Sequence, residues 1–244
     1  MISVVMPVYN TNHIWLKIAI ESLLKQTFRE FEIIIVNDGS TNLDTINTLN
    51  EYKKYCKIIT TSKKSGVAYS CNLGIKNAKF DIIARMDSDD ICISNRFEIQ
   101  FNYLKNNPNV DLVGSNIRFL YKENERWILG SKTRHPKVID KQAVIKYLWF
   151  INHPTVMFKK SKIIDIGGYS IDPYCVAEDF DLWARMVLKG MILHNIPNIL
   201  LYYREHRNNF SKIFKSNFRN WAFERRDFIF GDNKTIKENS IKLL

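Results

Sequence analysis

The feature that most constrains the fold of this chain is the alternation of short apolar strands with amphipathic helices through its N-terminal third. Apolar, largely β-branched runs at residues 3–8, 31–36 and 80–86 each end in a polar cluster, which is typical of a buried strand followed by a loop. Helical spacing of apolar residues over 15–26 and 68–78, a helix at 45–55 and a short strand at 57–60 complete the pattern. This order predicts an α/β fold with a doubly wound, mostly parallel sheet.

Three polar clusters follow the predicted strands. They are Tyr9-Asn10, Asp38-Gly39-Ser40 and Asp87-Ser88-Asp89-Asp90. In open sheets of this kind, ligands bind outside the carboxyl ends of the strands. We therefore expect the three clusters to converge on one crevice.

The acidic cluster carries the sharpest chemical signal. Asp87 and Asp89 stand two residues apart just past a strand, so both can reach one divalent cation directly or through water. Such carboxylates suit Mg²⁺ or Mn²⁺, which also bind substrate phosphates. The alternative is an aspartate-rich turn that caps the helix starting near Ser94. Arg85, a cation on the strand beside these carboxylates, favours an organised polar site.

Two segments, one after the second strand and one before the third helix, could bind a nucleotide. Asp38 can accept a hydrogen bond from a pyrimidine imide, and Gly39 allows the backbone to approach a ligand; the alternative is a plain turn. Ser65 and Gly66 could offer helix N-terminal amides to a phosphate, or could simply begin a helix.

Two later residues are candidates for catalysis. Asp179, next to Glu178, can act as a general base, although acidic residues also stabilise a helix N-terminus through its dipole. His206 can ligate a metal or contact a phosphate; the alternative is a structural or exposed histidine.

The pattern is weaker beyond residue 95. It predicts a helix over 96–106, strands at 111–120 and 155–159, and a helix over 179–188 that ends at Gly190. An apolar run at 199–203 is also strand-like. No internal repeat or linker divides the chain, which indicates one domain with a C-terminal appendage.

Composition limits the class of protein. With 45% hydrophobic residues in 244, the chain can bury a sizeable core, which excludes disorder and a disulfide-stapled miniprotein. The net charge of +11 attracts nucleic acid, nucleotide phosphates or an anionic membrane. The four cysteines show no Cys-x-x-Cys spacing, so we expect reduced thiols. Without a signal peptide or an apolar run of membrane-spanning length, the sequence predicts a soluble, cytoplasmic protein.

Seven sequence blocks together resemble the family 2 glycosyltransferases, over residues 3–211. The blocks are VVMPVYN, QTFREFEIIIVNDGSTN, SGVAYSCNLGIKNAKFDIIARMDSDDI, NHPTVMFKK, GGYS, AEDFDLWARM and YREHRNNFS. The resemblance implies an inverting, nucleotide-sugar-dependent enzyme with the GT-A fold, a Rossmann-like sheet flanked by helices with a smaller acceptor-side region. The chain departs from the family pattern at two positions. Many relatives have a second aspartate in place of Asn37, and some have arginine in place of Cys71.

The resemblance also implies roles for individual residues. Those expected to line the nucleotide-sugar are Pro7, Val8, Tyr9, Asn10, Asp38, Gly66, Asn72, Arg85, Asp87 and Ser88, with Asp38 contacting the uracil. Those expected to hold the metal on the donor diphosphate are Asp87, Asp89 and His206. Asp179 matches the catalytic base.

By the same resemblance, residues 1–95 form a nucleotide-sugar-binding half and residues 96–211 an acceptor-binding and catalytic half. Residues 212–244 form a basic, aromatic helical extension, expected either to touch an anionic membrane or to pack on the domain. The implied reaction moves a hexose or N-acetylhexosamine from UDP to a saccharide or lipid-linked saccharide with Mn²⁺ or Mg²⁺. It forms a β-glycosidic bond in surface polysaccharide or glycolipid synthesis, at the inner face of the cell membrane.

Two other functions fit the sequence less well. A sugar-nucleotide nucleotidyltransferase would need a glycine-rich, lysine-bearing loop near the N-terminus, and MPVYNTNHIW has none. A basic nucleic-acid-binding module would cluster Lys and Arg with exposed aromatics, which only the C-terminal extension does. We therefore expect no nucleic-acid partner.

Overall fold

The structure is a computed structural model that describes residues 1–147, 149–172, 174–175, 177–206, 209, 221, 224–227 and 230. The predicted extension at 212–244 lies outside the described residues except at positions 221, 224–227 and 230. No helix in the described ranges is long and apolar enough to cross a membrane. All four cysteines are free thiols, as expected.

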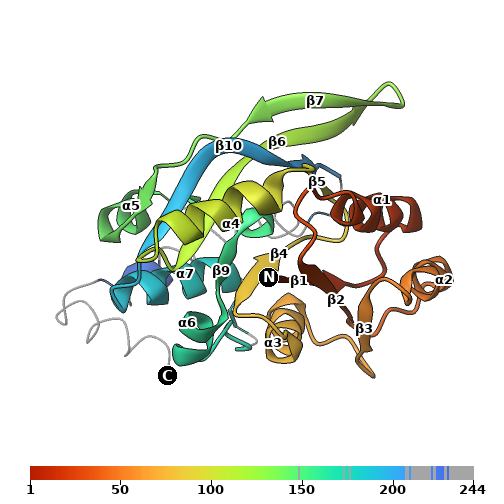
Figure 1. The fold of residues 1–244 in the computed structure, drawn as a ribbon, viewed down its shortest axis with the longest axis horizontal. Coiled ribbons are helices and arrows are strands. Elements are labelled where there is room, and N and C mark those ends of the chain that lie inside the picture. The colour runs from red at the N-terminus through yellow and green to blue at the C-terminus, as the bar shows by residue number, and fades with distance from the viewer. Residues whose placement is uncertain are drawn as a thin grey trace.

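The first four strands form the predicted parallel sheet. They are β1 (Ile2–Val8), β2 (Phe31–Asn37), β3 (Lys57–Thr60) and β4 (Ile82–Arg85), in the order β3-β2-β1-β4. The connecting helices are α1 (His13–Leu24), α2 (Leu43–Tyr52) and α3 (Val67–Asn77) (Figure 1). The predicted alternation is confirmed, with boundaries shifted by a few residues.

The sheet continues past β4 with strands of mixed direction. Next to β4 come β9 (Met157–Lys159), β6 (Leu112–Glu123), β10 (Leu193–Arg204) and β5 (Ile91–Cys92). β9 is antiparallel to both of its neighbours, whereas β10 is parallel to β6. The α/β fold class is confirmed, and the parallel pattern holds for its first half.

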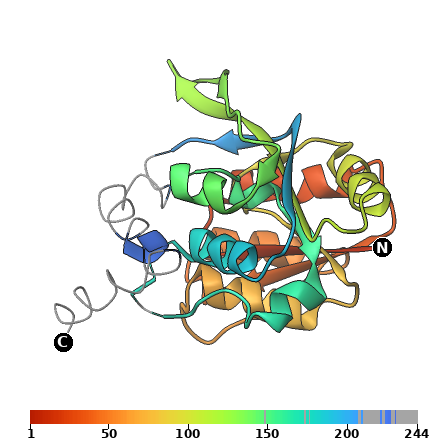
Figure 2. The same cartoon turned by 90° about the vertical axis from the view of Figure 1, so that its left-hand side faces the viewer.

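Several elements after β4 were not predicted. They are β5, β7 (Arg126–Lys132), β8 (Val138–Ile139), α5 (Lys141–Lys146) and α6 (Lys160–Asp165). β7 pairs with β6 as a hairpin that projects from the body of the molecule (Figure 2). Its turn uses Asn124 and Glu125, both at positive φ, where an Asn-Gly pair would have been the usual signal. The other elements are too short to show a periodicity.

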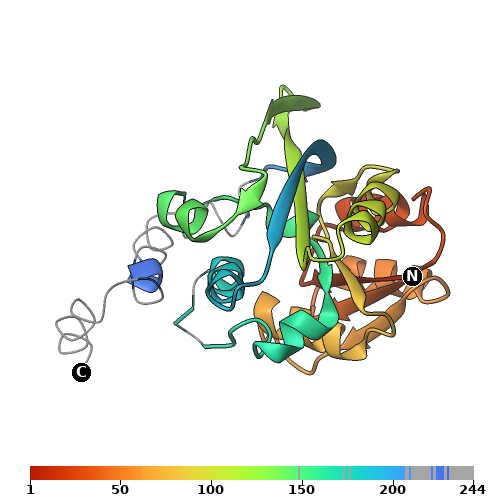
Figure 3. The same ribbon diagram turned by 60° about the vertical axis from the view of Figure 1, so that its left-hand side comes forward.

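Helices cover both faces of the sheet because the strand side chains alternate (Figure 3). Ile2, Val4, Met6 and Val8 of β1 pack in one core with α1, α2 and α4 (Arg96–Asn106). Val5 faces the other core, with α3, α5, α6 and α7 (Glu178–Leu188). Each core thus contains residues from both halves of the chain.

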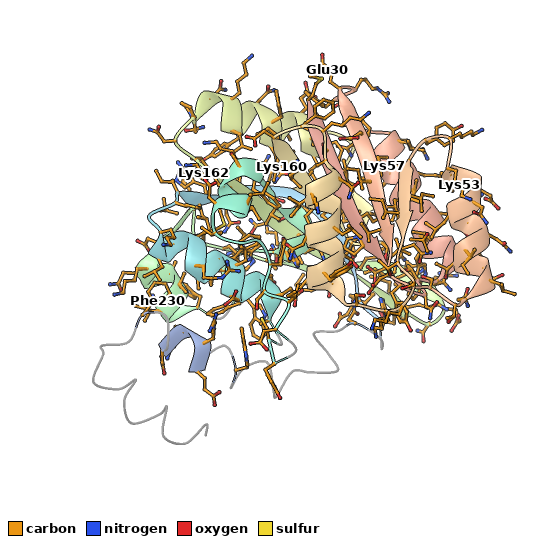
Figure 4. The ribbon with its side chains drawn as sticks, turned by 90° about the horizontal axis from the view of Figure 1, so that it is seen from below. Glu30, Lys53, Lys57, Lys160, Lys162 and Phe230 are labelled. Atoms are coloured by element: carbon orange, nitrogen blue, oxygen red, sulfur yellow. The ribbon has the colours of Figure 1, made fainter. Side chains whose placement is uncertain are left out.

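Part of the basic charge lies at the amino ends of the parallel strands, on the side of the sheet opposite the polar loops. Figure 4 labels Lys57, at the start of β3, and Lys160, directly after the antiparallel β9. Lys57 Nζ donates to the Asn77 side chain at 3.0 Å, and Lys160 Nζ donates to the Ala78 carbonyl at 2.8 Å. Both lysines therefore stabilise the C-terminal end of α3, where the helix dipole favours positive charge.

Candidate active site

The acidic loop, residues 87–90, follows the carboxyl end of β4. The parallel strands β1 and β2 end on the same side of the sheet. The Ser88 and Thr11 hydroxyl oxygens lie 2.7 Å apart, which ties the acidic loop to the loop after β1. Asn10 in turn contacts the loop after β2. The predicted convergence of the three polar clusters is therefore confirmed.

Three carboxylates gather on the acidic loop. Oxygens of Asp87, Asp89 and Asp90 lie within 4.8 Å of one another. Burial raises the pKa of Asp87, although the nearby Arg85 charge opposes the shift. Burial and the charges of Asp89 and Asp87 raise the pKa of Asp90 well above its ordinary value. A divalent cation would relieve this repulsion, and hard oxygen donors are the set that Mg²⁺ and Mn²⁺ prefer.

Asp90 is a site residue that the sequence reasoning did not assign. Its side chain is fully buried, and Oδ1 accepts the backbone N–H of Arg204 at 2.8 Å. Oδ2 has no hydrogen-bond partner among the described residues. Its place in the acidic run was the available signal, but the turn at residues 88–90 is what brings it back beside Asp87.

His206 joins the acidic loop from the far end of the chain. Its Nε2 lies 2.8 Å from Asp89 Oδ2. The contact is possible because β10 ends at Arg204, whose backbone N–H and Nε bond to Asp90 and to the Asp89 carbonyl. The structure brings His206 to Asp89, and the role of His206 as a metal ligand stays a prediction.

Arg85 is a buried cation, and two of its three guanidinium nitrogens have no hydrogen-bond partner among the described residues. Its Nη2 lies 2.6 Å from Asp87 Oδ1, whereas Nε and Nη1 have no hydrogen-bond partner in the described part of the chain. Burial opposes its charge, but the charge of Asp87 raises the pKa of Arg85 above its ordinary value. A guanidinium kept charged, with free N–H groups beside an acidic loop, suits an anion such as a diphosphate.

The predicted base lies at the start of α7. Asp179 Oδ1 accepts the backbone N–H of Phe180 at 2.8 Å. Burial raises the pKa of Asp179, while that hydrogen bond and the Arg85 charge oppose the shift. Burial and the charge of Asp179 raise the pKa of Glu178 to about 7. The pair therefore exchanges a proton with solvent closer to neutral pH than ordinary carboxylates do.

His153 and Tyr169 lie beside Glu178, and the sequence reasoning gave neither a role. His153 Nδ1 is 3.9 Å from Glu178 Oε1, and its Nε2 is 2.9 Å from the Tyr169 hydroxyl. Burial and the Arg85 charge lower the pKa of His153 well below its ordinary value, so this histidine is neutral. The Arg85 charge also acts on Asp87, Glu178 and Asp179, which places the acidic loop and the start of α7 in one electrostatic environment.

Asp38 is buried and engaged by the loop that precedes α3. Its Oδ1 accepts the N–H of Ser65 and its Oδ2 accepts the N–H of Gly66, both at 2.8 Å. Of the two alternatives for this segment, the structure favours a plain helix start, because Asp38 accepts both amides. The contact of Asp38 with uracil stays a prediction.

Asn10 joins the loops after β1 and β2. Its backbone is left-handed, with φ 46°, and its Oδ1 accepts the N–H groups of Thr41 and Asn42 at 2.8 and 2.9 Å. Gly39 in the second loop has φ 67°, and a Cβ there would lie 2.5 Å from the Lys63 backbone. Close packing of backbones therefore shapes this side of the site.

Tyr9 is the exposed member of the predicted nucleotide lining. Pro7 and Val8 are buried within β1, whereas Tyr9 is 41% exposed. Lys64 Nζ lies 4.5 Å from the centre of the Tyr9 ring. The ring therefore lies exposed at the end of β1, with the Lys64 ammonium group over one of its faces.

Asn72 connects α3 to the second half of the chain. Its Oδ1 accepts the N–H of Tyr169 at 2.9 Å, and its Nδ2 donates to the Tyr169 carbonyl at 2.8 Å. Gly168 has φ 74°, and a Cβ there would lie 2.5 Å from Asn72 Oδ1. The structure thus gives Asn72 a positioning contact, and its contact with the donor stays a prediction. Gly66 caps α3 with φ 96°.

The family model described as Glycosyl transferase family 2 matches residues 3–167. WbnJ, an O-antigen biosynthesis glycosyltransferase of Escherichia coli, is 32% identical over 245 aligned residues, covering 94% of this chain and 89% of that protein. A second Escherichia coli protein is named UDP-Gal:alpha-D-GlcNAc-diphosphoundecaprenol beta-1,3-galactosyltransferase. It is 30% identical over 205 residues, covering 82% of this chain and 72% of that one.

Solved structures show the same fold. The crystal structure of S. aureus TarS 1–349 in complex with UDP matches with a TM-score of 0.67 and 19% identity, over 96% of this chain and 73% of that one. The mannosyltransferase PcManGT from Pyrobaculum calidifontis, in complex with GDP-Man and Mn²⁺, matches with a TM-score of 0.66 and 13% identity, over 93% of this chain and 73% of that one.

Proposed function

The chain belongs to glycosyl transferase family 2, and from this premise we propose that it is an inverting glycosyltransferase with a UDP-sugar donor. The observation that carries the proposal is the arrangement around Arg85. This buried cation bonds Asp87 of the acidic loop, and its charge acts on the Glu178–Asp179 pair. A candidate cation-binding group and a candidate base thus lie near the same buried charge.

The donor is a UDP-hexose or a UDP-N-acetylhexosamine. Tyr9 and Asp38, at the ends of β1 and β2, are the residues we assign to its base. Support comes from the TarS complex, which contains UDP, and from the Escherichia coli relative named for UDP-Gal. The unpartnered Nε and Nη1 of Arg85 are assigned to the diphosphate.

Asp87, Asp89 and His206 are the residues we assign to a Mg²⁺ or Mn²⁺ ion, with Asp90 as a further oxygen donor. The three carboxylates fit such an ion, and the related PcManGT complex contains Mn²⁺. When bound, the ion would neutralise the charge that develops on the departing nucleoside diphosphate.

Asp179 accepts the proton of the acceptor hydroxyl as that oxygen attacks the anomeric carbon from the face opposite UDP. A single in-line displacement inverts the configuration, so an α-linked donor yields a β-glycoside. An ionised carboxylate is required for this step, and the Phe180 N–H and Arg85 both favour that form of Asp179.

We assign the acceptor to surface polysaccharide or glycolipid synthesis, as a saccharide or a lipid-linked saccharide. The O-antigen and diphosphoundecaprenol relatives support this class. The net charge of +11 would favour an anionic membrane surface, which fits a position at the cytoplasmic face. Flotation with anionic and with neutral vesicles tests this part: equal binding to both contradicts it.

A nucleotide-sugar hydrolysis screen tests the function directly. The protein is incubated with UDP-, GDP- and dTDP-sugars in Mn²⁺, in Mg²⁺ or in EDTA, and the free nucleoside diphosphate is measured. We expect UDP from one UDP-sugar, in the presence of metal only. Release of no nucleoside diphosphate from any donor contradicts the proposal. Release of pyrophosphate from UTP and a sugar phosphate would support the nucleotidyltransferase alternative. A gel shift with nucleic acid, together with no binding of UDP, would support the nucleic-acid-binding alternative.

A further inference from the structure

Trp127 is an exposed aromatic residue held against the acidic-loop side of the molecule. It belongs to the β6–β7 hairpin, which extends past β5 toward α1 (Figure 1). The Trp127 side chain is 38% exposed, and its ring centre lies 4.5 Å from the Arg204 guanidinium carbon. Trp15 of α1 approaches it edge-on, with ring centroids 6.0 Å apart at 80°. Its ring is therefore fixed on one side and open to solvent on the other.

Arg204 connects Trp127 to the acidic loop. Arg204 is 2% exposed, and its guanidinium carbon lies near both indole rings, 4.5 Å from the centre of Trp127 and 5.2 Å from that of Trp15. Its Nε donates to the Asp89 carbonyl at 2.7 Å, and its backbone N–H donates to Asp90. One buried residue thus sets the position of the indole ring relative to the predicted cation site.

Trp127 also lines a hollow at the tip of the hairpin. The hollow has a volume of 460 Å³ and is lined by Glu123, Asn124, Arg126, Trp127 and Ile128. A carboxylate, an amide and a guanidinium around an indole ring provide hydrogen-bond partners for hydroxyl groups and a flat apolar surface for C–H groups. A sugar ring has both of these features.

We propose that Trp127 and the hairpin tip bind a sugar ring of the acceptor, an inference that rests on the proposed glycosyltransferase function. The donor nucleotide is assigned to Tyr9 and Asp38, at the ends of β1 and β2. Trp127 contacts Arg204 at the end of β10, and Arg204 bonds the acidic loop. In the strand order, β10 lies on the side of β4 opposite β1 and β2. The acceptor is the substrate that must approach from outside the nucleotide-binding loops.

The test compares Trp127→Ala and Trp127→Phe with Leu129→Ala. Leu129 stands two residues along the same strand and is 46% exposed, which makes it a matched control. Transfer is measured from the UDP-sugar found in the screen to nitrophenyl glycosides of glucose, galactose, N-acetylglucosamine and N-acetylgalactosamine. We expect Trp127→Ala to raise the acceptor KM roughly 3- to 10-fold, more than it raises the donor KM. Trp127→Phe and Leu129→Ala should stay within about twofold of wild type.

Two results would overturn the inference. One is an acceptor KM that is the same in Trp127→Ala and in wild type for every glycoside. The other is an equal rise in donor KM, acceptor KM and metal requirement, because Trp127 would then act only through Arg204 on the cation site. A wild-type protein that releases UDP while these comparisons fail refutes this inference alone, whereas a protein that hydrolyses no nucleotide-sugar refutes the proposed function.

Discussion

The loops after β1 and β2 and the groups around the acidic loop satisfy their polar atoms in opposite ways. On the first side, Asn10 and Asp38 each bond two backbone N–H groups of a neighbouring loop. On the second side, buried atoms of Arg85, Asp90 and Arg204 have no hydrogen-bond partner in the described ranges of the chain. The first side is assembled before any ligand arrives, whereas the second retains polar atoms that a ligand or cation can satisfy.

This difference separates recognition from chemistry. A buried polar group without a partner costs about 1–3 kcal/mol, so a fold tolerates several together only where another group compensates. Charge develops on the diphosphate during transfer, and fixed groups aimed at that charge need no reorganisation when it appears. We therefore expect substitutions around Arg85 to change the rate and the metal dependence, and substitutions near β1 and β2 to change stability and nucleotide affinity.

The largest effect is expected at Asp179. Asp179→Asn keeps the shape of the side chain but removes its basicity, so the transfer rate should fall by roughly 10²- to 10⁴-fold. UDP affinity with Mn²⁺ should remain nearly unchanged. Initial rates of transfer and calorimetric titration with UDP measure the two quantities.

Glu178→Gln is the matched control, because Glu178 is the adjacent carboxylate at the same helix start. The assignment of Asp179 as the base is contradicted if Asp179→Asn transfers sugar at the wild-type rate while Glu178→Gln is inactive. The base would then be Glu178.

The second effect concerns the cation. Asp89→Ala, or EDTA with the wild-type protein, should weaken UDP binding roughly tenfold or more, since a charged contact is worth about 1.5–3 kcal/mol. Asp44→Ala, which removes an exposed carboxylate outside the site, should bind UDP as wild type does. Calorimetry with and without Mn²⁺ decides: equal UDP affinity in EDTA excludes the metal role of the acidic loop.

The third prediction concerns the loops after β1 and β2, whose polar atoms are already hydrogen-bonded. Asp38→Asn replaces one acceptor oxygen by a donor that faces a backbone N–H, so the free energy of unfolding should fall by about 1.5–3 kcal/mol. UDP affinity should fall as well. Urea unfolding measures the first quantity, with Asp44→Asn as the control. Unchanged stability would mean that the contacts with Ser65 and Gly66 do not hold this loop.

The smallest effect is a shift in the pH profile. Burial and the charge of Asp179 raise the pKa of Glu178 to about 7, so the pair takes up a proton as the pH falls through that value. Arg85, Asp87 and the neutral His153 also face this pair. Transfer by wild type should therefore decline below about pH 7.

Glu178→Gln leaves Asp179 without this neighbouring charge, so the decline should move to lower pH. Profiles of kcat/KM between about pH 5 and pH 9 measure it, with the exposed Glu51→Gln as the control. An identical acid limb in Glu178→Gln and wild type would show that the two carboxylates are not coupled.

The first half of the fold was predictable because its strands are continuous apolar runs and its helices carry regular apolar faces. Ile33, Ile34, Ile35 and Val36 are all buried, as a strand between two helix layers requires. The β6–β7 hairpin was not predictable in this way. Its first strand, β6, was predicted, but the residues of β7 are mostly exposed and the Asn124-Glu125 turn lacks the usual glycine.

By itself, the sequence determined the fold class, the acidic run after β4 and the family to which the chain is similar. These depend on local patterns and on the order of short blocks. Only the tertiary structure decided that Asp90 joins Asp87, that His206 meets Asp89 across 117 positions, and that Trp127 stacks on Arg204. Such contacts follow from how distant strands and turns pack around buried charges, and no local spacing encodes that geometry.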